Sequence, residues 1–146
     1  MIPEVSKSAL KTPLLLHRKV LLVDEDARDL QYYAAILQGQ GHEVRIVTSY
    51  AEGWLALERE RFDFVILSQG SREFEGRIVL QHAIEIERHI PVLVLTACLD
   101  MGCYLEAMQL GAADYLEKPV LPAELVRLIE THIGPYGIPS RAAGAA

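Results

Sequence analysis

The sequence contains little that points to a membrane protein, a disulfide framework or a metal centre. Its longest apolar stretches are strand-length, well short of the roughly 18–20 residues that a membrane-spanning helix needs. Its two cysteines, Cys98 and Cys103, do not have the spacing of a Cys-x-x-Cys redox motif, and no cluster of histidine and cysteine completes a zinc site. We expect two reduced thiols, and the sequence leaves a redox role for them open.

Positive charge is also scarce. The formal net charge is -6, and no cluster of lysine and arginine forms a basic patch. Acidity of this size disfavours sequence-independent binding to DNA, RNA or anionic lipid. The short leucine run near the amino terminus is not followed by a small-residue cleavage site, so it does not predict a signal peptide. We therefore expect a cytoplasmic protein that binds neither nucleic acid nor membrane.

The overall composition is that of a globular protein, with 51% hydrophobic and 23% charged residues. A chain of 146 residues fits one domain with a sizeable core. We predict a loose leader over residues 1–18, one domain over 19–133, and a flexible tail over 134–146 that is rich in glycine, proline, alanine and serine.

Strand-type and helix-type patterns alternate along the predicted domain. The expected strands are 19–23, 42–47, 62–67, 92–96 and 113–116. The expected helices are 27–38, 50–61, 77–88, 99–110 and 122–132. Repeated strand–helix units with short connections predict a three-layer α/β fold, in which a doubly wound, flavodoxin-like parallel sheet has the strand order 2-1-3-4-5.

Apolar periodicity predicts which helix residues face the core. The first two expected helices have apolar residues at Leu30, Tyr33, Ala34 and Leu37, and at Trp54, Leu55 and Leu57. The third carries Leu80, Ala83, Ile84 and Glu87, and in the fourth Cys103, Ala107 and Leu110 share one face. Asp26 and Ser49 are expected to cap the first two helices.

The third strand ends in Ser68, and a polar loop follows. In such a fold the residue that ends a buried parallel strand faces the crevice at the carboxyl edge of the sheet. The loops after strands 1, 3, 4 and 5 converge there. They carry Asp24 and Glu25, Ser68, Thr96, and Lys118.

Four stretches in this frame resemble the receiver domain of bacterial response regulators, the CheY-like family. They are Val20-Leu-Leu-Val-Asp-Glu-Asp26, Phe62-Asp-Phe-Val-Ile-Leu-Ser68, Pro91-Val-Leu-Val-Leu-Thr-Ala97 and Gly111-Ala-Ala-Asp-Tyr-Leu-Glu-Lys-Pro119. The resemblance covers about residues 19–133. In that family an acidic pair holds magnesium, and an aspartate that ends strand 3 accepts phosphate from a partner histidine.

The resemblance implies a role for each matching position. Asp24 and Glu25 correspond to the magnesium-binding pair, and Ser68 stands at the phosphoacceptor position. The phosphate-contact and switch positions are Thr96, Tyr115 and Lys118. Whether the Tyr115 ring points inward or outward is open.

The main departure from the family is Ser68, because the family has an aspartate there. A serine cannot form an acyl phosphate, so we do not expect Ser68 to be phosphorylated. Its hydroxyl also replaces a carboxylate ligand, so Mg²⁺ binding by Asp24 and Glu25 is expected to be weak or absent, and no other cofactor is expected. An internal ion pair between these carboxylates and Lys118 becomes an expectation. Arg72 replaces a family proline in the following loop, which predicts a different loop shape.

These features predict an atypical, stand-alone receiver-like protein of a two-component phosphorelay system. We expect no enzymatic activity and a function that is independent of phosphorylation. The expected partner is a signalling protein, either a sensor kinase or a downstream effector. In the family, the fourth helix, fifth strand and fifth helix carry partner or homodimer contacts. Here that surface would include exposed residues of 99–110, Asp114 or Glu117, and the helix 122–132.

Two alternatives remain open. The first is a working phosphorelay receiver that is phosphorylated at a displaced residue, since Glu73 and Glu75 lie in the loop after strand 3. The second, more remote, is a hydrolase that uses Ser68 and Lys118. Against it, a lysine beside carboxylates keeps its proton, and no oxyanion hole is apparent. A nucleotide or flavin site is set aside because the acidic run after strand 1 would repel phosphate.

Overall fold

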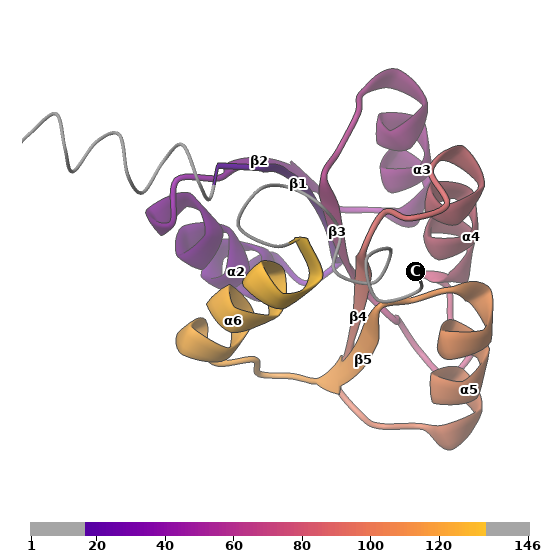
Figure 1. Cartoon of the computed structure of the whole chain (residues 1–146). Helices are drawn as coiled ribbons and strands as arrows, with labels where there is room; N and C mark the ends of the chain where they lie inside the picture. The colour runs from indigo at the N-terminus through magenta and orange to yellow at the C-terminus, as the bar shows by residue number, and fades with distance from the viewer. Residues whose placement is uncertain (1–16, 134–146) are drawn as a thin grey trace, which may run out of the picture.

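The computed structural model describes residues 17–133, which form a sheet between two layers of helices (Figure 1). The strands are β1 (Lys19–Val23), β2 (Glu43–Val47), β3 (Phe64–Ser68), β4 (Val92–Thr96) and β5 (Asp114–Glu117). The helices are α2 (Ala27–Gly39), α3 (Tyr50–Arg59), α4 (Arg77–Ile86), α5 (Met101–Leu110) and α6 (Pro122–Ile133). The predicted tail and residues 1–16 of the predicted leader lie outside the described residues.

All strand pairs are parallel, and the strand order is β2-β1-β3-β4-β5, which confirms the predicted fold. The register aligns the strands at their carboxyl ends, with Val23 opposite Leu67 and Ser68 opposite Leu95. The residues that follow these strands therefore lie at one edge of the sheet.

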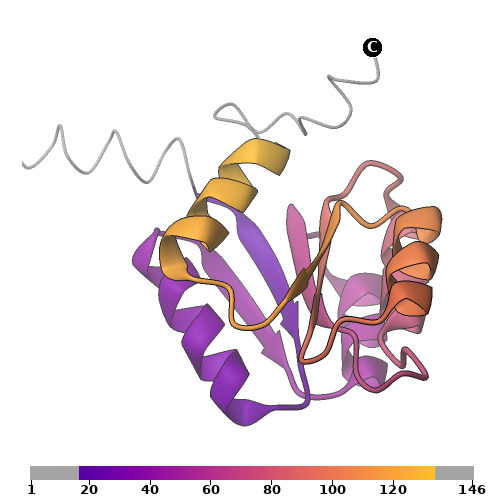
Figure 2. The ribbon, with the colours of Figure 1, turned by 90° about the horizontal axis from the view of Figure 1, so that it is seen from below.

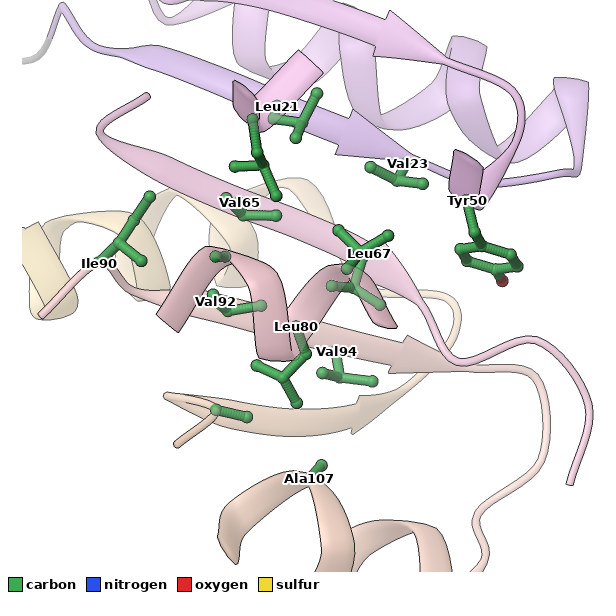
Figure 3. Packing of buried hydrophobic residues seen from close by; sticks show 14 of the residues in the cluster. Leu21, Val23, Tyr50, Val65, Leu67, Leu80, Ile90, Val92, Val94 and Ala107 are labelled. Atoms are coloured by element: carbon green, nitrogen blue, oxygen red, sulfur yellow. The ribbon is translucent and has the colours of Figure 1, made fainter. Parts of the chain in front are cut away.

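Each face of the sheet is covered by helices. Helices α2 and α6 lie on one face, and α3, α4 and α5 lie on the other (Figures 1 and 2). Alternate residues of a strand point to opposite faces. Val65, Leu67, Val92 and Val94 accordingly pack with Leu80 of α4 on the same face (Figure 3). Both β3 and β4 are buried along their whole length, as their continuous apolar runs predict.

The buried face of α3 differs from the predicted one. Trp54 is 38% exposed and Leu55 is 43% exposed. The buried residues are Tyr50, Gly53, Ala56 and Leu57. The helix approaches the sheet closely at Gly53: a Cβ at this residue would lie 3.0 Å from a methyl carbon of Val23. The face of α3 that carries Gly53 therefore meets the sheet, and Trp54 stacks on His82 instead.

Several element ends also differ from their predicted positions. Helix α5 begins later than expected because Asp100 caps it, with Oδ1 accepting a hydrogen bond from the Cys103 backbone nitrogen at 3.0 Å. Strand β3 begins two residues later than expected, at Phe64, and includes Ser68, which pairs with Leu95. Helix α4 ends earlier, at Ile86, with the exposed Glu87 as its C-cap.

We predict that Gly76→Ala destabilises the junction between β3 and α4. A Cβ at this position would overlap the Ser68 carbonyl oxygen and the Leu67 side chain. Such overpacking lowers the free energy of unfolding by about 1–3 kcal/mol, measurable by urea denaturation. Gly39→Ala is the matched control, since a Cβ there meets no atom within 4 Å. Equal stability of the two variants would show that the end of β3 can shift to make room.

Candidate functional site

Polar residues gather at the carboxyl edge of the sheet. Asp24 follows β1, Ser68 ends β3, Thr96 ends β4 and Lys118 follows β5, and the first three of these are buried. The structure thus brings together four of the predicted site residues. Glu25 lies beside them but is exposed to solvent.

The Lys118 ammonium is the centre of this cluster. Its Nζ lies 2.8 Å from Asp24 Oδ2, 2.8 Å from Asp29 Oδ2 and 3.4 Å from Ser68 Oγ. Burial by itself lowers the pKa of Lys118, but the hydrogen bonds and negative charges of Asp24 and Asp29 outweigh it, so that the pKa is raised. Lys118 is therefore a charged donor at neutral pH and cannot act as the base that a Ser68 nucleophile would require.

The second carboxylate on Lys118 is Asp29, which the sequence reasoning missed. The ion pair with Asp24 forms as predicted, whereas Asp29 takes the place expected for Glu25. Asp26 caps α2, and its Oδ1 accepts a hydrogen bond from the Asp29 backbone nitrogen at 3.3 Å. An acidic residue three positions after an N-cap lies in the first turn of the helix. The spacing of Asp26 and Asp29 could therefore have indicated that Asp29 lies near the site.

Both carboxylate oxygens of Asp24 are engaged. Oδ1 accepts a hydrogen bond from the Asp26 backbone nitrogen at 2.9 Å, and Oδ2 accepts the bond from Lys118. Within residues 17–133, no group of three or more histidine, cysteine, aspartate or glutamate side chains is arranged to hold a metal ion. One ammonium group, that of Lys118, thus faces the two carboxylates of Asp24 and Asp29.

Tyr50 closes the site from α3. Its hydroxyl donates a hydrogen bond to the Ser68 carbonyl oxygen at 3.0 Å, and its ring lies near the carboxyl ends of the strands (Figure 3). Burial raises the pKa of Tyr50 to about 12, and the nearby charges of Glu25, Asp24 and Glu75 add to the effect. This hydrogen bond therefore connects α3 to the backbone at residue 68.

The Thr96 side chain forms hydrogen bonds with the loop that follows β4. Its hydroxyl donates to the Cys98 carbonyl oxygen at 2.8 Å and accepts from the Cys98 backbone nitrogen at 3.1 Å. The side chain is 1% exposed. The hydroxyl therefore stabilises the start of the loop between β4 and α5.

Tyr115 points inward, which answers the question that the sequence left open. It is buried, and its hydroxyl donates a hydrogen bond to Oε1 of Gln69. The same hydroxyl oxygen accepts from the Asp100 backbone nitrogen at 3.3 Å. Burial raises the pKa of Tyr115. Gln69 was not predicted as a site residue, because a lone glutamine after a strand carries no periodicity or motif signal.

The loop after β3 is held by its own side chains. Glu75 accepts hydrogen bonds from the Ser71 backbone nitrogen at 2.6 Å and from the Ser71 hydroxyl at 2.7 Å, and these bonds lower the pKa of the carboxyl group. Arg72 forms an ion pair with Asp100 at 3.8 Å, so the residue that replaces the family proline ties the loop to the start of α5. Glu73 is exposed.

The two cysteines differ in their surroundings. Both are free thiols; Cys98 is exposed and Cys103 is buried. Burial raises the pKa of the Cys103 thiol, which disfavours the reactive thiolate. Whether Cys98 has a redox role stays open.

No helix within the described residues is long and apolar enough to cross a membrane.

Fold and site together define a doubly wound α/β domain with a buried carboxylate–lysine cluster at the carboxyl edge of its sheet. The model of the response regulator receiver domain family matches residues 20–130. The chain therefore belongs to the response regulator receiver domain family, which confirms the resemblance seen in the sequence.

Individual relatives agree with this assignment. The transcriptional regulatory protein ZraR of Escherichia coli O157:H7 is 37% identical over 122 residues, which are 78% of this chain and 27% of ZraR. The response regulator protein FleR of Pseudomonas aeruginosa is 35% identical over 114 residues, which are 78% of this chain and 24% of FleR. The chain thus spans about a quarter of the length of these relatives.

Solved structures give the same result. A CheY-like receiver domain protein from Methanospirillum hungatei JF-1 superimposes with a TM-score of 0.73 at 26% identity, covering 77% of this chain and 90% of that one. A receiver domain protein from Clostridium thermocellum gives a TM-score of 0.72 at 28% identity, covering 88% and 98% of the two chains.

We predict that Asp29→Asn lowers the pKa of Lys118, because one of the two carboxylates that raise it is removed. The pKa is measured from the ¹⁵Nζ chemical shift of Lys118 during a pH titration. Glu25→Gln is the matched control, because Glu25 has no hydrogen bond or ion pair with Lys118 and its loss should leave the pKa nearly unchanged. The opposite ranking would show that Glu25 is the effective partner.

The same ion pairs predict a pH dependence of stability. The folded-state pKa of Lys118 lies above the ordinary value of 10.5, so its contribution is fully present below about pH 10.5 and is lost as the pH rises through the folded-state pKa. The difference in unfolding free energy between wild type and Asp29→Asn should therefore be constant near pH 7–9 and shrink in more alkaline solution. A difference that persists undiminished would assign it to another interaction of Asp29.

Proposed function

We propose that this receiver domain signals by protein–protein contact and without phosphorylation. The observation that carries the proposal is the neutral Ser68 hydroxyl at the end of β3, 3.4 Å from Lys118, where the resemblance to the family places a phosphoacceptor aspartate. A hydroxyl cannot form the acyl phosphate that a carboxylate forms. The charge of Lys118 is instead satisfied by two carboxylates of the same chain.

The donor set also supports weak or absent Mg²⁺ binding. Magnesium prefers several oxygen ligands with little competing positive charge. Here Asp24 already has hydrogen bonds to both oxygens, one of them from an ammonium group, and Ser68 contributes no charge. The residues present therefore do not fit the ion well, and no cofactor is proposed for this site.

The two alternatives receive less support from the geometry. For a displaced phosphoacceptor, Glu75 has both oxygens bonded to Ser71, and Glu73 is exposed. For a hydrolase, Lys118 carries a raised pKa and cannot activate Ser68 as a base. We therefore propose a module without enzymatic activity.

Helix α5 offers a surface for the proposed contact. Its exposed apolar side chains are Met101, Tyr104, Leu105 and Met108. Its one charged side chain, Glu106, forms an ion pair with Arg77 at 2.5 Å, so the rest of this exposed face carries no charge. We call the four apolar side chains the α5 face. An uncharged apolar face on an exposed helix is typical of a protein contact site.

The occupant that we propose for the α5 face is a signalling protein, with a second copy of this chain as the form most easily tested. Partners of this kind, a sensor kinase or a downstream effector, would place the domain in the cytoplasm. Two free thiols are consistent with that reducing compartment. The proposal concerns the domain itself, whether it acts alone or within a longer regulator.

We predict that acetyl phosphate with Mg²⁺ adds no phosphoryl group to the wild-type protein, because no carboxylate is available at residue 68. Intact-mass spectrometry measures the addition. Amide NMR signals of Thr96, Tyr115 and Lys118 should likewise not move when beryllofluoride is added. Ser68→Asp supplies the missing carboxylate and should gain one phosphoryl group, whereas Ser68→Asn, of similar size and without charge, should gain none.

A phosphoryl group on the wild-type protein would overturn the proposal. Ser68→Ala and Glu75→Gln would then show which residue accepts it. Loss of the modification in Glu75→Gln would establish the displaced phosphoacceptor.

For the α5 face we predict that Leu105→Glu abolishes self-association, because a buried unpaired charge is costly in an apolar interface. Sedimentation velocity over a range of concentrations measures the dimer. Leu55→Glu is the matched control, since Leu55 is a leucine of similar exposure on α3. A wild-type protein that stays monomeric at all concentrations would rule out the homodimer and leave a different protein as partner.

A further inference from the structure

Gln69 follows the strand-end serine and is 2% exposed, although its side chain is polar. A buried amide needs partners for its oxygen and for its nitrogen, or its burial is costly. The contacts of the Gln69 amide group therefore determine how costly its burial is.

Every polar group of Gln69 has a partner. Its backbone nitrogen donates to the Leu95 carbonyl oxygen at 2.7 Å, and its backbone carbonyl accepts from the Gly76 nitrogen at 3.0 Å. Its side-chain Nε2 donates to the Ser71 carbonyl oxygen at 3.0 Å, and its Oε1 accepts from the Tyr115 hydroxyl. The residue thus connects β3, β4, the following loop and β5.

The direction of these bonds is determined by chemistry. A carbonyl oxygen can only accept, so the Ser71 carbonyl must face the Nε2 group of Gln69. That leaves Oε1 toward Tyr115, whose hydroxyl must then donate. The lone pairs of the Tyr115 oxygen remain available for the backbone nitrogen of Asp100, which donates to it at 3.3 Å.

The chain of bonds reaches the start of α5. Asp100 is the N-cap of that helix, and its Oδ1 accepts from the Cys103 nitrogen. The ring of Tyr104, which belongs to the α5 face, meets the ring of Tyr115 edge-on with centroids 5.8 Å apart. The position of Tyr115 is therefore coupled by direct contacts to the proposed contact surface.

We propose that Gln69 is a positioning residue that holds Tyr115 inward and so sets the arrangement of the α5 face with no phosphate or metal at the site. The inference rests on the proposed function, since it supplies a fixed arrangement for a module whose acceptor position is neutral. Without the Gln69 acceptor, the inward Tyr115 hydroxyl keeps only the Asp100 carbonyl oxygen, 3.5 Å away, as an acceptor for its proton. An outward ring could bond to water, so the equilibrium would shift outward.

The experiment compares wild type with Gln69→Met, which keeps the length and volume of the side chain and removes both polar groups. Three-bond scalar couplings measure the χ1 angle of Tyr115 in the unphosphorylated proteins. We expect one inward rotamer in wild type. The outward-to-inward ratio should rise at least about fivefold in the variant, the factor expected when a buried hydroxyl loses its acceptor. The amide signals of Asp100 and Cys103 should move as well.

Two further variants separate positioning from general stability. Gln81→Met makes the same chemical change at an exposed glutamine of α4 and should leave Tyr115 inward. Tyr115→Phe keeps the ring and removes the hydroxyl that bonds to Gln69. In that background, Gln69→Met should add little further movement at Asp100 and Cys103, because the shared bond is already absent.

A Gln69→Met protein that folds and keeps Tyr115 inward, with unmoved Asp100 and Cys103 signals, would overturn the inference. Additive shifts in the double variant would do the same. The result is independent of the phosphorylation test, since all measurements use unphosphorylated protein. Phosphorylation of the wild-type protein would contradict the proposed function but not the role of Gln69. An inward Tyr115 in Gln69→Met would contradict only this inference.

Discussion

The ion pairs of Lys118 are the interaction on which the site depends. An ammonium group at the buried carboxyl edge of a sheet is costly unless oxygen atoms replace the water that it loses. Asp24 and Asp29 supply those oxygens from the end of β1 and from the first turn of α2. The loop after β5 is therefore held against segments distant in the sequence, and Tyr32 and Tyr33 of α2 add hydrogen bonds to Val120 in the same loop.

Lys118 forms its ion pairs with Asp24 and Asp29, and the nearby Ser68 contributes no charge. Phosphoryl transfer to a carboxylate needs a nucleophilic oxygen and positive charge to neutralise the phosphate. The domain has Lys118 and Asp24, but its third strand ends in a neutral hydroxyl. The polar groups of this cluster therefore bond to one another, and Ser68 adds no charge to them.

The loop between β3 and α4 contacts Tyr115 and the start of α5 through its own polar side chains. Phe74 in this loop is buried and adopts a positive φ of 56°, unusual for a bulky side chain. Around it, Glu75 binds Ser71, Arg72 reaches Asp100, and Gln69 binds Tyr115. Side chains of one loop therefore connect the acceptor position to the start of α5 by short-range polar contacts.

The sequence by itself determined the architecture, because strand alternation, helix caps and short connections are local signals that admit few topologies. It also placed Asp24, Ser68, Thr96 and Lys118 at one edge, since parallel strands share their carboxyl ends. Only the tertiary structure decided which carboxylates meet Lys118, how α3 packs through Gly53, and that Gln69 holds Tyr115 inward. Those outcomes depend on the distance between helix and sheet and on which buried polar groups find partners, and neither quantity is encoded in any one stretch of sequence.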